Sequence, residues 1–218
     1  SYVWQFYAAD TAHTQTVTDG NGEMADYYTN GALKSWYNYK DGLKHGPFEE
    51  ASIYGYYLMK GEFRENQPHG EWRYYYYTGD LEKISHYENG KLNGSYKYFY
   101  DNGELNVRGN FIDGEKSGQW TWYTNSGKID MQGNFKKGLQ HGKWTYNYPT
   151  GELSYKAEYK EGLKDGTWKY FYKDGSKFKT GTFKADKKNG TWKTWYENGN
   201  LLMEGDYKID KEEGEWKN

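Results

Sequence analysis

The stretch GTWKYFYKDG, residues 166–175, places a run of aromatic side chains between two glycines. The same layout recurs along the chain at a constant spacing of 24 residues, for example as GSYKYFYDNG at 94–103 and GTWKTWYENG at 190–199. Self-similarity at a fixed period of this length is the signature of a repeat protein whose units stack on their neighbours. The fold therefore depends on one repeated unit and not on any single stretch.

The glycines follow the same period. One column opens each unit and includes Gly118 and Gly142, and another closes the aromatic run and includes Gly127 and Gly151. Two looser columns include Gly114 and Gly109, and of the 28 glycines only Gly20 lies outside these four columns. Because glycine tolerates positive φ and leaves room for a close neighbour, the columns mark turns and close contacts.

The composition favours an all-β fold. Aromatic residues make up 21% of the chain, with 26 tyrosines, and no segment shows the 3.6-residue period of an amphipathic helix. Each unit is predicted to be two strands joined at a sequence such as Asn102-Gly103, because Asn-Gly tolerates the positive φ of a type I′ turn. The second connection, as in DGEKSG at 113–118, is predicted to be longer and polar.

A two-residue turn sets the pairing within each hairpin, so that Trp168 lies opposite Gly181 and Trp192 opposite Gly205. A ring over a glycine on the paired strand covers backbone that water would otherwise solvate. We therefore expect a repeat core formed by one aromatic and one glycine column. Its members are Trp72, Tyr96, Trp120, Trp144, Trp168 and Trp192, with Gly109, Gly133, Gly181 and Gly205.

A two-stranded unit is not stable alone in water, but stacked neighbours can share a continuous aromatic strip. Residues 27–218 are accordingly predicted to form an elongated, single-layer antiparallel sheet of about eight stacked 24-residue hairpins. Residues 1–26 fit the columns poorly and are expected to be an N-terminal cap or edge segment. The chain starts at Ser1 rather than methionine, which is compatible with a removed N-terminal segment, and an extracytoplasmic location is slightly favoured over the cytoplasm.

Charge and motifs exclude several function classes. The formal charge is -2 with no strong basic cluster, which argues against nucleic acid, and no apolar run is long enough to span a membrane. There is no cysteine, and the motifs of P-loops, serine hydrolases and zinc proteases are missing from the sequence. The histidines His45, His69 and His141 lie in different units and do not converge. We predict no enzyme activity, no cofactor and no metal site.

The face opposite the core strip is predicted to be polar, with lysine or arginine at many positions. Aromatic residues on that face are the candidate contacts for a partner, since a line of exposed rings usually marks an interaction surface. They are Tyr75, Phe99, Tyr123, Phe171 and Trp195. A protein partner is expected, and basic residues such as Arg73, Lys97 and Lys193 leave an anionic membrane surface as a second option. The segment EEASIYGYYLMKG at 49–61 departs most from the pattern and is either a contact site or drift.

The repeated unit, best seen at 94–114 and 190–205, has the form G-x-W-x-Y-[FY]-Y-x-[ND]-G-x-L-x-x-x-G-x-[FY]-x-x-G. It resembles the MORN repeat, and more closely the bacterial variant known as the YwqK-type antitoxin-component repeat, over about residues 22–217. The resemblance implies membrane association, dimerisation or scaffolding. Choline- or glucan-binding repeats, which also contain Gly-x-Trp-x-Tyr-Tyr, are the second family to consider, but their units are shorter.

These observations predict a non-catalytic scaffold for protein–protein interaction, or a subunit of a larger complex such as one of the cell envelope. Two alternatives stay open. The protein is an immunity protein that neutralises a partner toxin, or it is an aromatic module that binds glycans or choline.

Overall fold

The computed structural model describes residues 3–6 and 15–217, and every regular element in these residues is a β-strand. Strands β1 (Val3–Phe6) and β2 (Gln15–Thr18) pair as a separate two-stranded antiparallel sheet. The next strand, β3 (Gly22–Tyr27), is in contact with β2. The predicted cap at 1–26 lies partly outside the described residues, and its role stays a prediction.

The other strands follow along the chain, and within each of the two compact units described below they pair antiparallel with neighbours in sequence. They are β4 (Leu33–Lys40), β5 (Leu43–Ala51), β6 (Tyr57–Arg64), β7 (Gln67–Tyr75), β8 (Leu81–Glu88), β9 (Lys91–Phe99), β10 (Leu105–Ile112), β11 (Glu115–Tyr123), β12 (Ile129–Lys136), β13 (Leu139–Asn147), β14 (Leu153–Lys160), β15 (Leu163–Lys164), β16 (Gly166–Phe171), β17 (Lys177–Lys184), β18 (Lys187–Trp195), β19 (Leu201–Lys208) and β20 (Lys211–Lys217). The short β15 and the longer β16 both pair with β14.

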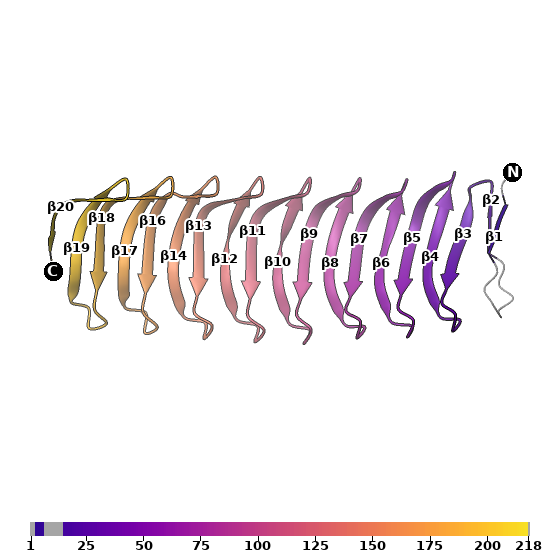
Figure 1. The fold of residues 1–218 in the computed structure, drawn as a ribbon, viewed down its shortest axis with the longest axis horizontal. Helices are drawn as coiled ribbons and strands as arrows, with labels where there is room; N and C mark the ends of the chain where they lie inside the picture. Colours follow the sequence, from indigo (N-terminus) through magenta and orange to yellow (C-terminus); the bar gives the residue numbers. More distant parts are fainter. Residues whose placement is uncertain (1–2, 7–14, 218) are drawn as a thin grey trace. The chain divides into compact units, whose positions relative to one another are not determined.

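The chain divides into two compact units. The first unit comprises residues 1–105 and 111–114, and the second comprises 106–110 and 115–218. Within each unit, each strand packs mainly against the strands next to it in the sequence. Each unit is therefore a single layer of successive hairpins (Figure 1). The predicted all-β fold of antiparallel hairpin repeats is confirmed.

The turns at Asn-Gly sequences differ from the prediction. Gly103 has a φ of 82°, but Asn102 does not have a positive φ. The Gly103 N–H donates to the carbonyl of Tyr100 (3.0 Å), and the Tyr100 N–H donates to the carbonyl of Glu104 (2.8 Å). This is a three-residue loop, in which a type I turn is followed by a left-handed glycine that creates a bulge. The predicted two-residue type I′ turn at Asn102-Gly103 is therefore wrong.

Type I′ turns occur at the other ends of the strands, where a longer connection was predicted. In DGEKSG only Asp113 and Gly114 form the turn, with φ values of 51° and 84°. Lys137 and Gly138 repeat this geometry, with φ values of 51° and 72°. The type I′ turn suits a hairpin because its twist matches that of the flanking strands. The polar residues that follow the turn already belong to the next strand.

Successive type I′ turns within a unit are bonded to one another's strands. The Gly138 N–H donates to the carbonyl of Lys116, 22 residues earlier (3.0 Å). Where aspartate replaces this glycine, at Asp186 (φ 67°), a second bond is added: the Lys164 N–H donates to the Asp186 carboxylate (2.7 Å). Aspartate and asparagine tolerate left-handed φ and supply an acceptor, which explains why they replace glycine in this column.

The predicted pairing of the core columns is confirmed, since Trp168 lies opposite Gly181 and Trp192 opposite Gly205. The predicted ring contact is wrong, however, because each indole covers the glycine on its other side. A Cβ placed on Gly181 would lie 2.1 Å from the ring of Trp192, and one on Gly133 would lie 2.0 Å from the ring of Trp144. The indole therefore joins its own repeat to the preceding one.

A bulge directs the indole toward the preceding repeat. Gly142, with a φ of 72°, lies where the register between β12 and β13 shifts from Gln132 to Asn134. The Trp144 side chain lies over this irregularity, and its Nε1–H donates to the Asn134 carbonyl (3.2 Å). The same bond is made by Trp72 to Glu62, by Trp120 to Asn110 and by Trp168 to Glu158, at 3.1, 3.1 and 3.3 Å.

These indoles are the most buried part of the sheet, although no second layer of strands covers them. Trp120 and Trp144 are each only 1% exposed, because rings of neighbouring strands pack on both sides. An indole buries about 150–250 Å². At about 25 cal/mol per Å², this contributes on the order of 4–6 kcal/mol per repeat before ordering costs.

Replacing Gly133 by valine is expected to lower the free energy of unfolding by about 1–3 kcal/mol. The added side chain would occupy the space of the Trp144 ring, so the indole must leave the bulge and give up its bond to the Asn134 carbonyl. Asn134→Val is the matched control, because the Asn134 side chain is exposed. Urea unfolding followed by tryptophan fluorescence checks this, and equal stability of both variants would contradict the indole–glycine contact.

Alkaline pH is expected to destabilise the fold through the buried tyrosines. Burial raises the pKa of Tyr155 to about 12, with added effects of the neighbouring Tyr146 and Tyr170, and burial also raises the pKa of Tyr96. A hydroxyl with a higher pKa in the folded state stabilises it below pH ~10, and this stabilisation is lost as the pH rises toward ~12. An ultraviolet titration should show fewer tyrosinates in the native protein than in urea near pH 11; identical curves would refute the burial.

Candidate interaction surface

The five aromatic residues predicted to bind a partner all lie at one place in the repeat. Tyr75, Phe99, Tyr123, Phe171 and Trp195 are the last residues of β7, β9, β11, β16 and β18, beside the three-residue loops. All five are half-buried rather than exposed. Contact with a partner at these positions stays a prediction.

The backbone of this column has a structural role that the sequence did not reveal. The hydroxyl of Tyr148 donates to the carbonyl of Phe171 (2.8 Å), and that of Tyr172 donates to the carbonyl of Trp195 (2.8 Å). In the first unit, Tyr76 donates to Phe99 in the same way (2.7 Å). Each tyrosine thus reaches the next repeat at the loop edge of the sheet.

A continuous band of rings covers one face of the second unit, and we call it the aromatic face. Neighbouring rings are in stacked or edge contact, as shown by Tyr146 and Tyr155, whose centroids are 4.2 Å apart at 11°. Trp120, Trp144, Trp168 and Trp192 lie deepest, and the other rings of this face are half-buried. The aromatic face consists of Trp120, Trp122, Phe135, Trp144, Tyr146, Tyr155, Tyr159, Trp168, Tyr170, Phe183, Trp192, Tyr207 and Trp216.

Lysine ammonium groups lie over this face at regular positions. Lys116, Lys164 and Lys188, which we call the lysine column, each follow a type I′ turn. Each places Nζ over rings of the same hairpin, three rings for Lys116 and two for each of the others. The Lys188 Nζ is 5.2 Å from the centroid of Trp192 and 4.5 Å from that of Tyr207. A cation over a ring face within about 6 Å is attracted by the ring quadrupole.

The lysine column is partly desolvated and has no carboxylate partner. Burial lowers the pKa of the Lys116 ammonium, and burial together with the nearby Lys188 lowers that of Lys179, whose Nζ is 5.7 Å from Trp192. Among the described residues, no aspartate or glutamate forms an ion pair with any of these lysines. The aromatic face therefore presents positive charge that its own protein does not neutralise.

The lysine column differs from the sequence prediction, which placed the basic residues on the opposite face. On that face, Lys193 pairs with Glu204 (2.9 Å) and Arg73 pairs with Glu71 (2.7 Å). Cations that are already paired contribute little attraction for an anionic surface. The signal that identifies the lysine column is its spacing in multiples of 24 residues directly after each turn.

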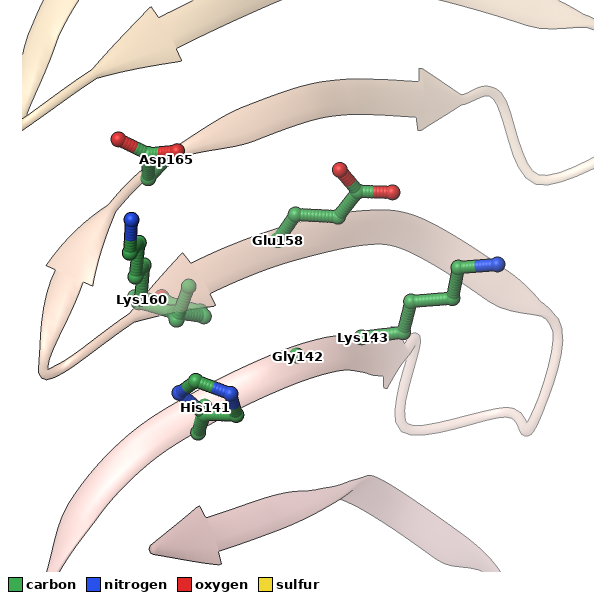
Figure 2. Close-up of a pocket in the computed structure, with 7 residues that line it drawn as sticks. His141, Gly142, Lys143, Glu158, Lys160 and Asp165 are labelled. Carbon is green, nitrogen blue, oxygen red and sulfur yellow. The ribbon is translucent and has the colours of Figure 1, made fainter.

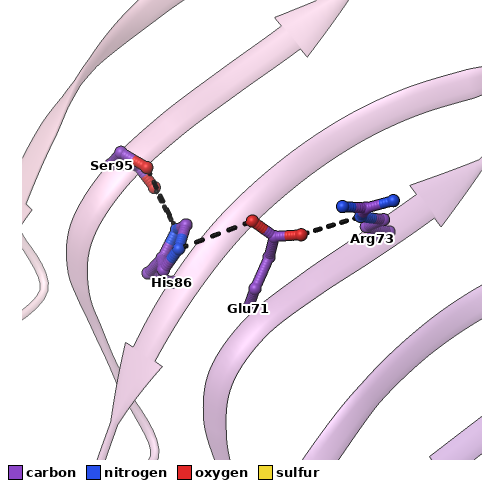
Figure 3. A network of polar contacts seen from close by, with 4 residues as sticks. All are labelled: Glu71, Arg73, His86 and Ser95. Atoms are coloured by element: carbon purple, nitrogen blue, oxygen red, sulfur yellow. Dashed lines mark hydrogen bonds and ion pairs between the residues drawn. The ribbon is translucent and has the colours of Figure 1, made fainter.

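Figure 3 shows a polar network in the first unit that resembles a hydrolase triad in residue types. The Ser95 hydroxyl lies 3.0 Å from Nδ1 of His86, and Nε2 of His86 lies 3.6 Å from the Glu71 carboxylate. The same carboxylate accepts a bond from Nε of Arg73 (2.7 Å). Ser95 and Glu71 are exposed, whereas a catalytic triad acts in a site that excludes water.

A shallow hollow of about 430 Å³ lies in the second unit at the bulges of β13, β14 and β16 (Figure 2). It mixes both signs of charge, and the Glu158 carboxylate is already bonded to the Thr167 N–H (3.1 Å). It therefore does not favour one class of charged ligand. Its lining residues are His141, Gly142, Lys143, Glu158, Tyr159, Lys160 and Asp165.

Within residues 3–6 and 15–217, histidines and carboxylates do not gather into a group of three that could hold a metal ion. The same residues contain no helix with the length and apolarity that a membrane crossing requires.

The segment 49–61, which departs most from the repeat pattern, forms an exposed aromatic patch at the loop edge of the first unit. Tyr54 and, in the next loop, Tyr77 are each 83% exposed, which is unusual for residues of this size. The ring of Tyr56 lies against Gly79, since a Cβ there would be 3.0 Å from it. The patch thus spans two adjacent hairpin loops.

Six segments of the chain match the family described as MORN repeat variant, at residues 68–91, 92–113, 116–137, 140–161, 164–185 and 188–208. No curated protein sequence matches the chain. Among solved structures, a chain of the crystal structure of TcdB2-TccC3-Cdc42 is 11% identical with a TM-score of 0.25, and the match covers 93% of this protein and 14% of that chain. A chain of the Photorhabdus luminescens Tc holotoxin pore is 12% identical with a TM-score of 0.19, covering 86% and 13%. The protein therefore spans only a small part of the length of each of these two chains.

Proposed function

Because the chain belongs to the MORN repeat variant family, whose repeats are generally modules for protein or membrane interaction, we propose that it is a non-catalytic scaffold that binds a protein partner on its aromatic face. The observation that supports this function is the lysine column, whose cations lie over half-buried rings without a carboxylate. Rings with unneutralised charge above them offer both apolar area and an electrostatic preference to an incoming chain.

A protein partner fits this face better than an anionic membrane does. A membrane surface attracts clustered, exposed basic residues in proportion to their number. Here the basic residues of the polar face are in part paired with carboxylates, and the unpaired lysines lie within an aromatic band. Aromatic rings are enriched in the centres of protein interfaces, and complementary charge adds selectivity for a partner.

The non-catalytic part of the proposal is tested at the triad-like network. The unaltered protein and its Ser95→Ala variant are expected to hydrolyse an activated ester at the same rate. That rate should equal the rate given by free histidine at the same concentration. The reason is that Ser95 is exposed and the Glu71 carboxylate is shared with Arg73. A turnover that depends on Ser95 would instead assign enzyme activity to the protein.

The binding part is tested by affinity purification from the cell that produces the protein. Lys164→Glu with Lys188→Glu should abolish recovery of the partner, because carboxylates then replace the cations over the rings. Lys184→Glu with Lys187→Glu is the matched control: it changes the same charge at exposed positions of the same two hairpins. Tyr54→Ser with Tyr77→Ser tests the loop patch. Equal recovery by the column variant and both controls would refute the aromatic face as the binding site.

The bacterial subgroup and the two alternative functions lead to different observations. An immunity protein would restore growth to cells that express its toxin, and would do so through a stoichiometric complex. A glycan- or choline-binding module would show saturable heat with those small ligands. These results would replace the scaffold by the corresponding function.

A further inference from the structure

The spacing of the lysine column restricts the conformation of a chain that can bind along it. Lys164 and Lys188 occupy equivalent positions in adjacent hairpins of the second unit, two strands apart. Neighbouring strands lie about 4.8 Å apart, so the two positions are separated by about 9.6 Å across the sheet. Lys116 is two repeats before Lys164, with Gln140 at the intermediate position.

Three regular conformations can be compared with this spacing. A polyproline II helix has three residues per turn and a rise of about 3.1 Å, so every third side chain returns to the same side after about 9.3 Å. In a β-strand, side chains return to one side after about 6.6 Å or 13 Å. In an α-helix, side chains return to the same side after seven residues and about 10.5 Å. This repeat differs from the spacing of the lysines by roughly 1 Å per hairpin. The polyproline II helix matches the sheet best.

The chemistry of the aromatic face agrees with this comparison. Polyproline II segments bind in aromatic-lined grooves, where rings pack against the prolines and little conformational entropy is lost. On this face, Tyr155 is stacked with Tyr146 and lies 5.8 Å from Trp168 at 15°. The lysine column adds a cation at three repeats of this face, whereas Gln140 and Glu212 occupy the equivalent positions in two others.

We propose that the aromatic face binds a polyproline II segment of a partner protein that carries carboxylates at every third residue, with a neutral residue opposite Gln140. The carboxylates pair with Lys116, Lys164 and Lys188, and the residues between them lie on the rings. Near Trp192 the segment meets two cations, Lys179 and Lys188, so its acidic character is strongest there. This inference rests on the proposed function as a protein-binding scaffold.

The test uses two synthetic peptides of identical composition and the full chain. The peptide EPPQPPEPPE places its glutamates in the register of the lysine column, whereas EPEPEPQPPP places them two residues apart. Titration followed by tryptophan fluorescence or calorimetry should show at least about tenfold tighter binding of the first peptide. Lys164→Gln with Lys188→Gln should weaken that binding by about three- to tenfold, as expected for partly exposed charge pairs. Lys184→Gln with Lys187→Gln should leave it unchanged.

The circular dichroism spectrum of the bound peptide should keep its polyproline II signature. Equal binding of both peptides, no binding of either, or loss of binding in the control variant would overturn the inference. Binding to phosphatidylserine vesicles, with no preference between the peptides, would overturn it in favour of a lipid surface. If the cellular partner is still lost with the lysine-column variant while the peptides fail, the proposed function stands and only the polyproline II inference is refuted.

Discussion

The contact between an indole and bare backbone of the preceding repeat is the interaction on which this structure depends. A single-layer sheet has no opposing layer to bury its apolar face, so the core must come from side chains lying flat along that face. Glycine at Gly133 or Gly181 provides the room, and the bulge at the leading glycine directs Trp144 or Trp192 into it. The same contact satisfies a backbone carbonyl through the indole N–H of Trp144.

Three lines of interaction within each unit join one repeat to the next. The indoles do so in the middle of the strands, tyrosine hydroxyls such as that of Tyr172 do so at the loop edge, and the type I′ turns do so at the opposite edge. Each is local, which is the usual organisation of repeat proteins, where stability is a sum over neighbours. The candidate binding surface is the exposed side of this same aromatic core, so folding and recognition use one set of rings.

The two faces of the sheet differ in how their charges are satisfied. On the polar face, pairs such as Lys193 with Glu204 neutralise cations within the protein. On the aromatic face, Lys164 and Lys188 interact with rings, which attract a cation but do not neutralise it. This difference makes the aromatic face more selective for an acidic partner than the polar face is. The rings of the aromatic face also form the structural core.

The sequence by itself determined the all-β class, the 24-residue repeat and the pairing of Trp168 with Gly181. It could do so because a residue type that recurs at one position indicates a contact that every repeat makes. The side on which an indole lies was decided by the tertiary structure, since a period reports the spacing of Trp192 and Gly181 but not the direction of a bulge. The same holds for the turns: Asn102-Gly103 is compatible with either turn type in isolation, and only the bonds of Tyr100 with Gly103 and Glu104 define the three-residue loop. The lysine column is visible as a spacing, yet its position over the rings follows only from how the strand continues beyond the turn.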